Sequence, residues 1–228
     1  PTSTRALING KRHYDVGTEE KLPSVTTILQ ATQSEEKRQK LEDWKKRMGE
    51  QRADRIRDIS AMRGTSMHTY LEGYIKDERH LDLTALGQEA GRMADVVIRS
   101  GLGDLEEVWG TEVTLYYPGL YAGATDVVGI YNGRESIIDF KQTNKPKQRE
   151  WIDDYFTQLA AYAMAHNYVY DTQIQSGIIL MCSKDGFFQK FEVLDKEFQG
   201  YMHTFLKKVD QYYANCTKNE EGQGTKND

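Results

Sequence analysis

The sequence predicts an α/β fold in which a mixed β-sheet is flanked by helices. A helical N-terminal half precedes three consecutive segments of alternating apolar residues, at 106–117, 121–131 and 134–142. A helix at 151–167 follows, and then two more strands at 173–183 and 187–194. Strands combined with helices in this order are typical of a sheet that is covered by helices on its faces.

The N-terminal half begins with an extended segment over residues 1–23. Ser24 is a suitable N-cap for a short helix that runs through Leu29. The helical pattern then predicts helices at 35–48, at 51–76 with an interruption near Gly64, and at 84–99.

Turn residues punctuate the C-terminal half. Pro118-Gly119 has the order of a type II turn, so the first two strands are expected to form a hairpin. Asp195 can cap a last helix to about residue 214, and the polar tail from Thr217 is expected to be disordered. We therefore expect one domain, made of an integral N-terminal part at 1–100, a core at 101–216 and a tail at 217–228.

Composition narrows the class of protein. The 228 residues carry a net charge of −5, which disfavours a protein whose only task is to coat DNA but not a nuclease with an acidic metal site. No apolar run reaches the ~18 residues needed to span a bilayer, and no signal-peptide pattern is visible. Cys182 and Cys216 are too few for a disulfide framework or a four-cysteine cluster. We expect a reducing, cytoplasmic compartment.

Two aspartates are predicted to face each other across a tight hairpin. Asn132-Gly133 between two alternating runs is a strong signal for a two-residue loop. Such a loop places Asp126 directly across from Asp139, with Cβ atoms roughly 4.5–5.5 Å apart. Like charges at that distance repel unless a cation neutralises them, and carboxylate oxygens suit a hard divalent ion.

Lys141 shares the face of Asp139 because side chains alternate along a strand. A metal held by the two carboxylates would activate water and polarise a phosphate, while Lys141 would neutralise developing charge. The alternative is a solvated hairpin face with an incidental Asp–Lys pair. A change of one residue in the loop would also separate the two acids.

Two helical motifs carry further candidates. Gly64, His68 and Glu72 fall on one helix face, so His68 is either a metal ligand or a surface residue paired with Glu72. Gln158 and Tyr162 are four residues apart on the helix after Lys141, and they either orient that lysine or pack as an ordinary amphipathic face. Glu112 reaches the acids only if the Pro118-Gly119 loop or a bulge gives it the right parity.

Basic residues gather in two regions that could contact phosphate. One follows Lys141 directly, and the other lies on the N-terminal helices, where a plain solvated face is the alternative. The candidate DNA contacts are Lys145, Lys147, Arg149, Arg63, Lys45, Lys46 and Arg47.

Taken together, these motifs resemble the RecB-like branch of the PD-(D/E)xK nuclease superfamily. The resemblance rests on four motifs in order over roughly residues 60–165: Gly64-x-x-x-His68, Gly123-x-x-Asp126, Asp139-Phe140-Lys141 and Gln158-x-x-x-Tyr162. The stretch Pro23–Leu29 and the charged helix after it resemble the start of mitochondrial genome maintenance exonuclease and related phage exonucleases. A phage-type member would act in the host cytoplasm.

The resemblance implies a restriction-endonuclease-like core and hydrolysis of phosphodiester bonds with Mg²⁺ or Mn²⁺. By the family motif, His68, Asp126, Asp139 and the carbonyl of Phe140 bind metal, and Lys141 is the catalytic lysine. Gln158 and Tyr162 form a supporting catalytic motif. The expected substrate is DNA, single-stranded or with free ends, and the N-terminal helices resemble elements that flank a single strand.

Two departures qualify the resemblance. The second acid is Asp139, where many superfamily members have glutamate, and the four cysteines of iron–sulfur relatives are missing, so no such cluster is expected. Two other functions stay open at this point. One is a non-catalytic protein that binds nucleic-acid ends or a partner protein, and the other is an endonuclease of restriction type.

Overall fold

The computed structural model describes residues 3–18 and 21–224 of the chain. The strands of the N-terminal part are β1 (Thr4–Ile8), β2 (Lys11–Asp15) and β3 (Leu22–Pro23), and its helices are α1 (Val25–Ala31), α2 (Glu35–Met48), α3 (Glu50–Ile75) and α4 (Ala85–Gly101). The remaining elements are η1 (Leu102–Asp104), β4 (Leu105–Tyr117), β5 (Tyr121–Tyr131), β6 (Arg134–Thr143), η2 (Arg149–Trp151), α5 (Asp153–Tyr170), β7 (Ser176–Ser183), β8 (Phe188–Leu194) and α6 (Asp195–Gly224).

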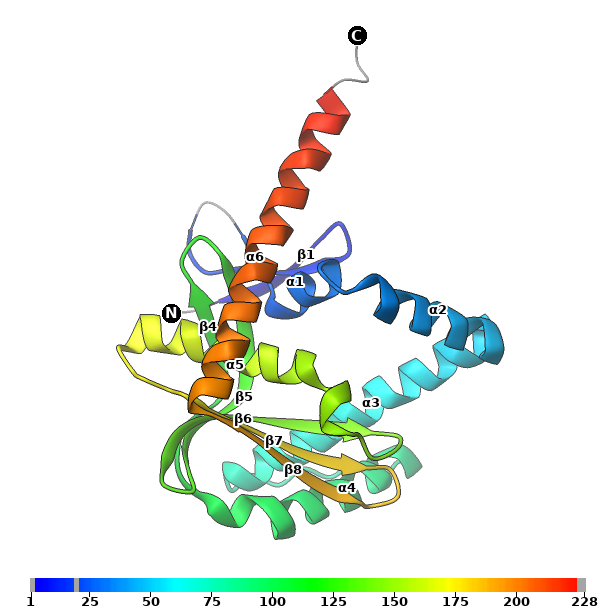
Figure 1. Ribbon diagram of the computed structural model, residues 1–228. Coiled ribbons are helices and arrows are strands. Elements are labelled where there is room, and N and C mark those ends of the chain that lie inside the picture. The colour runs from blue at the N-terminus through cyan, green and yellow to red at the C-terminus, as the bar shows by residue number, and fades with distance from the viewer. Residues whose placement is uncertain (1–2, 19–20, 225–228) are drawn as a thin grey trace.

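A five-stranded mixed sheet forms the centre of the molecule (Figure 1). The strand order is β4-β5-β6-β7-β8, with β6 and β7 parallel and the other neighbours antiparallel. Helix α5 makes the crossover between the two parallel strands, as such a connection requires. The predicted fold class is therefore confirmed.

Helices cover both faces of this sheet. Helices α3 and α4 pack on one face, where Ile138 and Phe140 are buried with residues of both helices. Helices α1, α5 and α6 pack on the other face, against Ile137 and Ile179 among others. The alternation along β6 therefore sends Ile138 and Phe140 into one core and leaves Asp139 and Lys141 on the side of α5, as predicted.

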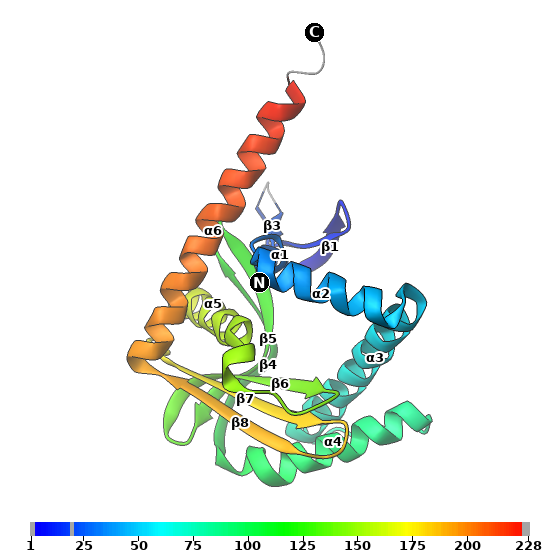
Figure 2. The ribbon, with the colours of Figure 1, turned by 45° about the vertical axis from the view of Figure 1, so that its right-hand side comes forward.

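The N-terminal part adds a small sheet and a helical projection. Strands β1, β2 and β3 form a three-stranded antiparallel sheet, in which Tyr14 and Leu22 pack against Ala122 of β5. Ser24 caps α1 by accepting a hydrogen bond from the Thr27 amide, as predicted. Helix α2 and the first part of α3 extend away from the body of the molecule (Figure 2).

Several helix boundaries differ from the prediction, and three of the differences concern Gly64, Trp151 and the end of α6. Helix α3 runs unbroken past Gly64, because the glycine lets the Gln142 side chain of β6 pack closely against the helix. Trp151 lies in a 3-10 turn, and α5 begins at Asp153. Helix α6 continues to Gly224, so the disordered tail predicted from Thr217 was wrong up to that residue; residues 225–228 lie outside the described range.

The extension of α6 has a local cause. Glu, Gln and Lys are good helix formers and favour a continued helix in this exposed segment. The Thr217 hydroxyl donates to the Tyr213 carbonyl one turn earlier and so stays within the helical hydrogen-bonding pattern. Figure 1 shows this end of α6 projecting beyond the sheet. In the part of the chain described, no helix combines the length and apolarity needed to cross a bilayer.

The register between β4 and β5 depends on Gly129. A Cβ atom at this position would lie 2.0 Å from the Glu107 carbonyl oxygen, beside the irregularity in the β4–β5 ladder. We expect Gly129→Ala to destabilise the protein by roughly 2 kcal/mol, because a backbone contact cannot move aside as a side chain can. Gly200→Ala is the control, since its Cβ on α6 meets no atom and should stabilise the helix by about 1 kcal/mol. Urea unfolding of the three proteins measures both effects, and equal stabilities would contradict this account.

Candidate active site

The β5–β6 hairpin brings the two predicted aspartates together. Tyr131 pairs with Arg134 around the Asn132-Gly133 loop, and the same register continues to Val127 and Ile138. Asn132 and Gly133 have φ values of 48° and 75°, as the two central residues of a type I′ turn require. One residue further on, Asp126 and Asp139 are close enough for their carboxyl groups to share a hydrogen bond. The predicted register is confirmed.

The backbone pairing between β5 and β6 ends at this point, and the Asp126 side chain makes the hydrogen bond that the next backbone pair would have made. The Phe140 amide donates to Oδ2 of Asp126 over 2.8 Å. The side chain of Asp126 is thereby fixed on the backbone of the opposite strand. Asp139 is 4% exposed, so the pair does not lie on a solvated surface.

Lys141 connects the acids to α5. Its Nζ lies 2.9 Å from Oδ2 of Asp139 and donates to Oε1 of Gln158 over 3.0 Å. The Gln158 amide in turn donates to the Tyr162 hydroxyl over 2.8 Å. The ring of Tyr155 lies 4.6 Å from Nζ and adds a cation–π contact. A four-residue chain from Asp139 to Tyr162 therefore holds the lysine, which disfavours the incidental-pair alternative.

His68 faces the acids from α3, and Glu72 is not its partner. Nε2 of His68 lies 2.7 Å from the Phe140 carbonyl oxygen, which can only accept, so the imidazole donates there. Nδ1 lies 3.4 Å from Oδ1 of Asp126. Glu72 instead pairs with Lys76 over 2.6 Å, so the surface His–Glu pair considered from the sequence is not formed.

Glu112 lies beside the two aspartates, although the sequence gave only a weak indication that it would reach them. Residues 118–120 form a three-residue loop between β4 and β5, and the pairs on either side place Glu112 directly opposite Asp126. Glu112 has a φ of 47°, which is uncommon for a glutamate. Ligand atoms of His68, Glu112 and Asp126 all lie within 4.8 Å of one another. Counting the pairing across a three-residue loop would have identified this residue.

Electrostatics separate the two aspartates. Burial, repulsion by Asp139 and the hydrogen bond shared with that residue raise the pKa of Asp126 well above its usual value. Burial acts in the same direction on Asp139, but the Lys141 ammonium and the bond from Asp126 lower the pKa of Asp139 overall. Burial opposes the charge of Lys141 as well, yet Asp139 raises the pKa of the lysine above its normal value. Asp139 and Lys141 thus form a compensated ion pair, and Asp126 is left without a cation of its own.

The two remaining titratable groups follow the same pattern. Burial lowers the pKa of His68, so its imidazole is neutral and able to act as a ligand at neutral pH. Burial, followed by repulsion from Glu72, raises the pKa of Glu112. The negative charge that the carboxyl groups around Asp126 can carry therefore exceeds the positive charge of the nearby cations.

This donor set fits a divalent cation. Carboxylates and a backbone carbonyl are the ligands of hard cations, and a neutral imidazole completes a mixed N/O set. Among the described residues, His68, Glu112 and Asp126 bring their ligand atoms together, and Asp139 and the Phe140 carbonyl lie beside them. The approach of three such ligand atoms to within 4.8 Å of one another is the observation that favours such an ion over a plain polar cluster.

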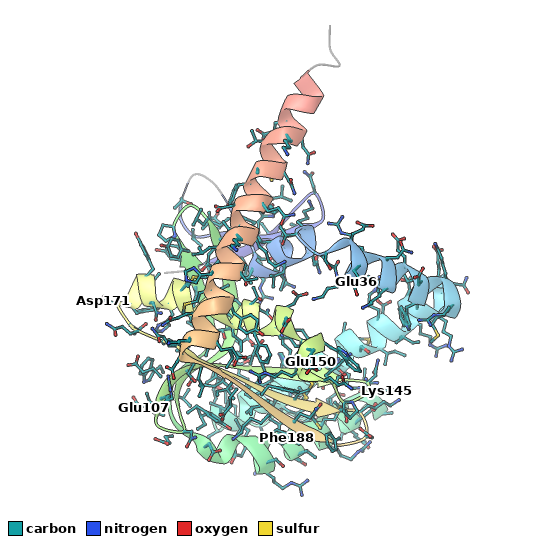
Figure 3. The ribbon with its side chains drawn as sticks, in the orientation of Figure 1. Glu36, Glu107, Lys145, Glu150, Asp171 and Phe188 are labelled. Atoms are coloured by element: carbon teal, nitrogen blue, oxygen red, sulfur yellow. The ribbon has the colours of Figure 1, made fainter. Side chains whose placement is uncertain are left out.

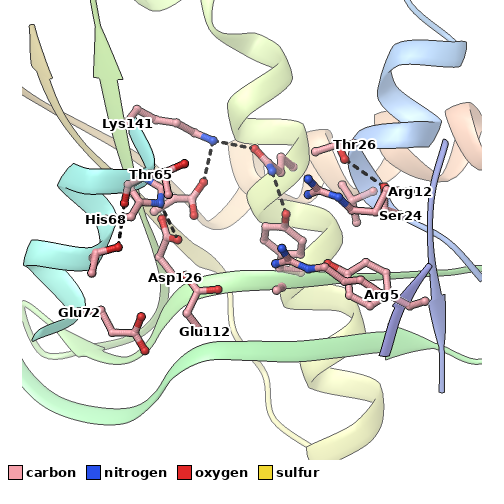
Figure 4. A pocket seen from close by; sticks show the side chains of 18 residues that line it. Arg5, Arg12, Ser24, Thr26, Thr65, His68, Glu72, Glu112, Asp126 and Lys141 are labelled. Carbon is pink, nitrogen blue, oxygen red and sulfur yellow. Dashed lines mark hydrogen bonds and ion pairs between the residues drawn. The ribbon is translucent and has the colours of Figure 1, made fainter. Parts of the chain in front are cut away.

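The site lies in a cavity of about 480 Å³ (Figure 4). Asp126, His68 and Lys141 lie on one side of it (Figure 4), and Asp139, Gln158 and Tyr162 also line it. Gly123 explains part of the second motif, because a Cβ there would lie 2.6 Å from Cε1 of Tyr162. The glycine therefore allows Tyr162 to pack on β5 and reach Gln158.

The predicted basic contacts divide into three kinds. Arg63 is 3% exposed and donates hydrogen bonds to Gln142 and Asn144, which lie far from it in the sequence. The prediction that Arg63 contacts a phosphate is therefore wrong. Arg149 pairs with Glu197 over 2.5 Å and lies 4.7 Å from the Phe156 ring. Arg149 therefore contacts both α6 and α5, although its side chain stays 39% exposed.

The lysines remain accessible. Lys145 and Lys147 line a cavity of about 530 Å³ with Trp44, Met48 and Tyr155, between the β6–α5 connection and the projecting helices. Figure 3 shows Lys145 at the end of β6, near α3. On α2, Lys46 and Arg47 are exposed and Lys45 is half-buried, so the structure permits both a phosphate contact and the solvated face considered from the sequence.

Comparisons with known proteins agree with this geometry. No protein-family model matches the chain. Mitochondrial genome maintenance exonuclease 1 of Mus musculus is 30% identical over 201 residues, which are 84% of this chain and 59% of the mouse protein. The Homo sapiens protein of the same name is 30% identical over 205 residues, 84% of this chain and 58% of the human one. The chain thus spans a little under two thirds of these relatives.

A solved structure shows the same fold. The crystal structure of a candidate exonuclease from Eubacterium rectale matches with a TM-score of 0.53 and 14% identity, over 72% of this chain and 68% of the other. The chain is thus similar in sequence to mitochondrial genome maintenance exonuclease 1 and shares its fold with a solved exonuclease structure.

The uncompensated charge at Asp126 has a measurable cost. In metal-free protein at neutral pH we expect Asp126→Asn to raise stability by an amount on the order of 1 kcal/mol, or about 2–4 °C. The amide oxygen can still accept the Phe140 N–H. Asp139→Asn is the matched control: it leaves Lys141 without its counter-charge and should cost on the order of 3 kcal/mol.

The pH dependence follows from the direction of the Asp126 shift. A raised folded-state pKa means that the carboxyl contributes its full stability below its unfolded pKa of about 3.9 and loses it as pH rises through the folded value. The gain from Asp126→Asn should therefore be largest at neutral pH and vanish in acid. Melting curves of the wild type and of Asp126→Asn in EDTA from pH 4 to 8 test this. An equal fall in the stability of both proteins as the pH rises would contradict it.

Proposed function

We propose that this protein is a metal-dependent DNA exonuclease that hydrolyses phosphodiester bonds and prefers single-stranded DNA or free ends. The main support is the convergence of four sequence motifs on one cavity, with Asp126 beside Asp139 and Lys141 held by Gln158. The similarity to exonucleases over 84% of the chain adds to it.

The metal would be Mg²⁺ or Mn²⁺, held by His68, Asp126, Asp139 and the Phe140 carbonyl, with Glu112 as a further ligand. Such an ion supplies polarisation of the phosphoryl oxygen and activation of water. His68 and the Phe140 carbonyl, now hydrogen-bonded to each other, would both be ligands of the ion. Asp126 would bind as a carboxylate, which its raised pKa opposes at lower pH.

Lys141 provides a fixed positive charge next to the site of cleavage. Asp139 keeps the lysine protonated, and Gln158 and Tyr162 hold its ammonium group in place. A preorganised cation stabilises charge that develops on the phosphate in the transition state more than it stabilises the substrate. Tyr162 itself is buried and acts through Gln158.

The preference for single strands is supported by the second cavity. Lys145 and Lys147 can follow a sugar–phosphate backbone, while Trp44 and Tyr155 offer aromatic faces on which unpaired bases stack. The name of the curated relatives refers to genome maintenance, which points to DNA as the polymer. An intact duplex would offer no exposed base faces to these rings.

Two other functions differ in what they predict. A non-catalytic relative that binds nucleic-acid ends or a partner protein would keep the cavity but not need the compensated Asp139–Lys141 pair. A restriction-type endonuclease would use the same site on a substrate without ends. The complete set of site residues favours catalysis, and the groove lined by aromatic rings favours a single strand.

Metal binding should be visible without any substrate. We expect Mg²⁺ or Mn²⁺ at millimolar concentration to raise the melting temperature, since ligands that bind only the folded state stabilise it. Glu112→Gln should reduce that rise, while Glu42→Gln on exposed α2 should leave it unchanged. Calorimetry at pH 6 and 8 should show tighter binding at the higher pH, because Asp126 must lose its proton. No thermal shift with any divalent ion would exclude the metal site.

Catalysis should depend on the acids and the lysine. Asp126→Ala and Lys141→Ala should each lower cleavage of end-labelled single-stranded DNA by roughly 10²–10³-fold or more. Asp210→Ala and Lys207→Ala remove equivalent charges from the exposed surface of α6 and should be active. Circular single-stranded DNA should resist the wild type. Cutting of the circle would favour an endonuclease, and normal cleavage by Asp126→Ala would refute the assignment.

A further inference from the structure

The wall of the cavity opposite the acids carries two arginines that no motif includes. Arg5 and Arg12 line it from the small N-terminal sheet (Figure 4). We propose that they bind a backbone phosphate of the DNA strand next to the phosphate being cut, and so hold the end of the strand in the site. The inference rests on the proposed nuclease function and adds two specific residues to it.

The register of the N-terminal hairpin fixes the direction of both side chains. Arg5 pairs with Tyr14, and Leu7 pairs with Arg12, so these four residues share one face of the sheet. Tyr14 is 2% exposed and packs against Ala122 of β5, which places that face against the nuclease core. Arg5 and Arg12 therefore lie on the face that carries Tyr14, where both stay exposed and line the cavity.

The backbone beneath Arg12 is held firmly. Its carbonyl oxygen accepts hydrogen bonds from the Ser24 amide over 3.0 Å and from the Thr27 hydroxyl over 2.9 Å. Ser24 in turn forms an isolated bridge with Ala122 of β5. A guanidinium that extends from such a point has a fixed base and loses less entropy when it binds a ligand.

Within the described residues, neither guanidinium is paired with a carboxylate. In residues 3–18 and 21–220, where side chains are described, no carboxylate lies within ion-pair distance of Arg5 or Arg12. Arg5 is close enough to Glu112 to lower the pKa of that acid, and it lies 5.9 Å from the Tyr14 ring. In a chain with a net charge of −5, two arginines without a carboxylate partner in one acidic cavity indicate an anionic ligand.

A backbone phosphate fits as that anionic ligand. The planar guanidinium matches two phosphate oxygens at once, which an ammonium group cannot do. The acids on the other wall would hold the metal and the phosphate being cut, so the arginines are free to take the neighbouring one. A strand that enters past Lys145 and Tyr155 would then meet Lys141 first and the arginines last.

The test compares Arg5→Gln and Arg12→Gln with Lys11→Gln. Lys11 is exposed on the same hairpin and points to the opposite face, so its loss removes the same charge from a surface outside the cavity. Binding of a fluorescent single-stranded oligonucleotide is measured by anisotropy in Ca²⁺ at several salt concentrations, with the oligonucleotide checked for intactness afterwards.

Each arginine variant should weaken binding by roughly tenfold, the scale of one charge-assisted contact. Each should also reduce the slope of log K against log salt by about 0.7, because one phosphate contact is lost. Lys11→Gln should match the wild type in both. Equal effects of all three variants would reduce the arginines to a general charge effect and overturn the proposal, as would unchanged binding by both arginine variants.

A neutral linkage in the substrate locates the phosphate. Oligonucleotides with a single methylphosphonate, placed at each of the first few linkages from either end, are bound by wild type and by Arg12→Gln. At one linkage the wild type should lose affinity while the variant loses none, because both changes remove the same contact. Additive losses at every linkage would overturn the proposal.

The cleavage assay and the binding assay test the nuclease function and the arginine contact separately. Absence of cleavage by the wild type in Mg²⁺ or Mn²⁺ would refute the proposed function, whereas the anisotropy experiments report the arginine contact without any cleavage. Conversely, an active enzyme whose arginine variants bind normally would keep the proposed function and lose only this subsite.

Discussion

The approach of Asp126 to Asp139 across the β5–β6 hairpin is the constraint on which the site depends. A type I′ turn at Asn132-Gly133 fixes the register, and the register forces two buried carboxylates together. Lys141 compensates only one of them, so Asp126 keeps a raised pKa and an unfavourable charge. Folding must overcome that repulsion through the two cores that enclose β6. Stability lost at one pair of residues in this way is common where a protein prepares a binding site.

Local signals in the sequence are sufficient for this hairpin but not for the residues that reach it from elsewhere. The Asn-Gly turn determines the pairing of its own strands, so the sequence alone is enough to place Asp126, Asp139 and Lys141 on one face. Glu112 depends on a second loop, where Pro118-Gly119 is part of a three-residue connection, and one residue more or less would reverse the face on which it lies. His68 needs the family motif, because nothing local shows which strand a helix residue will contact.

The charged residues show the same limit. Arg63 and Arg149 look like solvent-exposed phosphate contacts in the sequence, yet their partners Asn144 and Glu197 lie 81 and 48 residues away. Only the folded chain brings those groups together. Helix α3 crosses Gly64 without a break for a similar reason, since packing against Gln142 offsets the helix-breaking tendency of a single glycine. Periodicity thus predicts most elements well, while long-range pairing determines which polar residues are free.

The N-terminal sheet is best understood as a wall of the active site rather than as a separate appendage. Gly123, which precedes Asp126 in its motif, has its missing Cβ replaced by two neighbours, the ring of Tyr162 and Cγ2 of Val25. Tyr162 holds Gln158, which holds Lys141, and Val25 begins the helix that Ser24 caps. Ser24 is bonded to Arg12, whose side chain reaches the same cavity. One glycine therefore lies where the supporting motif, the first helix and the N-terminal hairpin meet, so a shift of the hairpin would displace Tyr162 and, through it, the lysine.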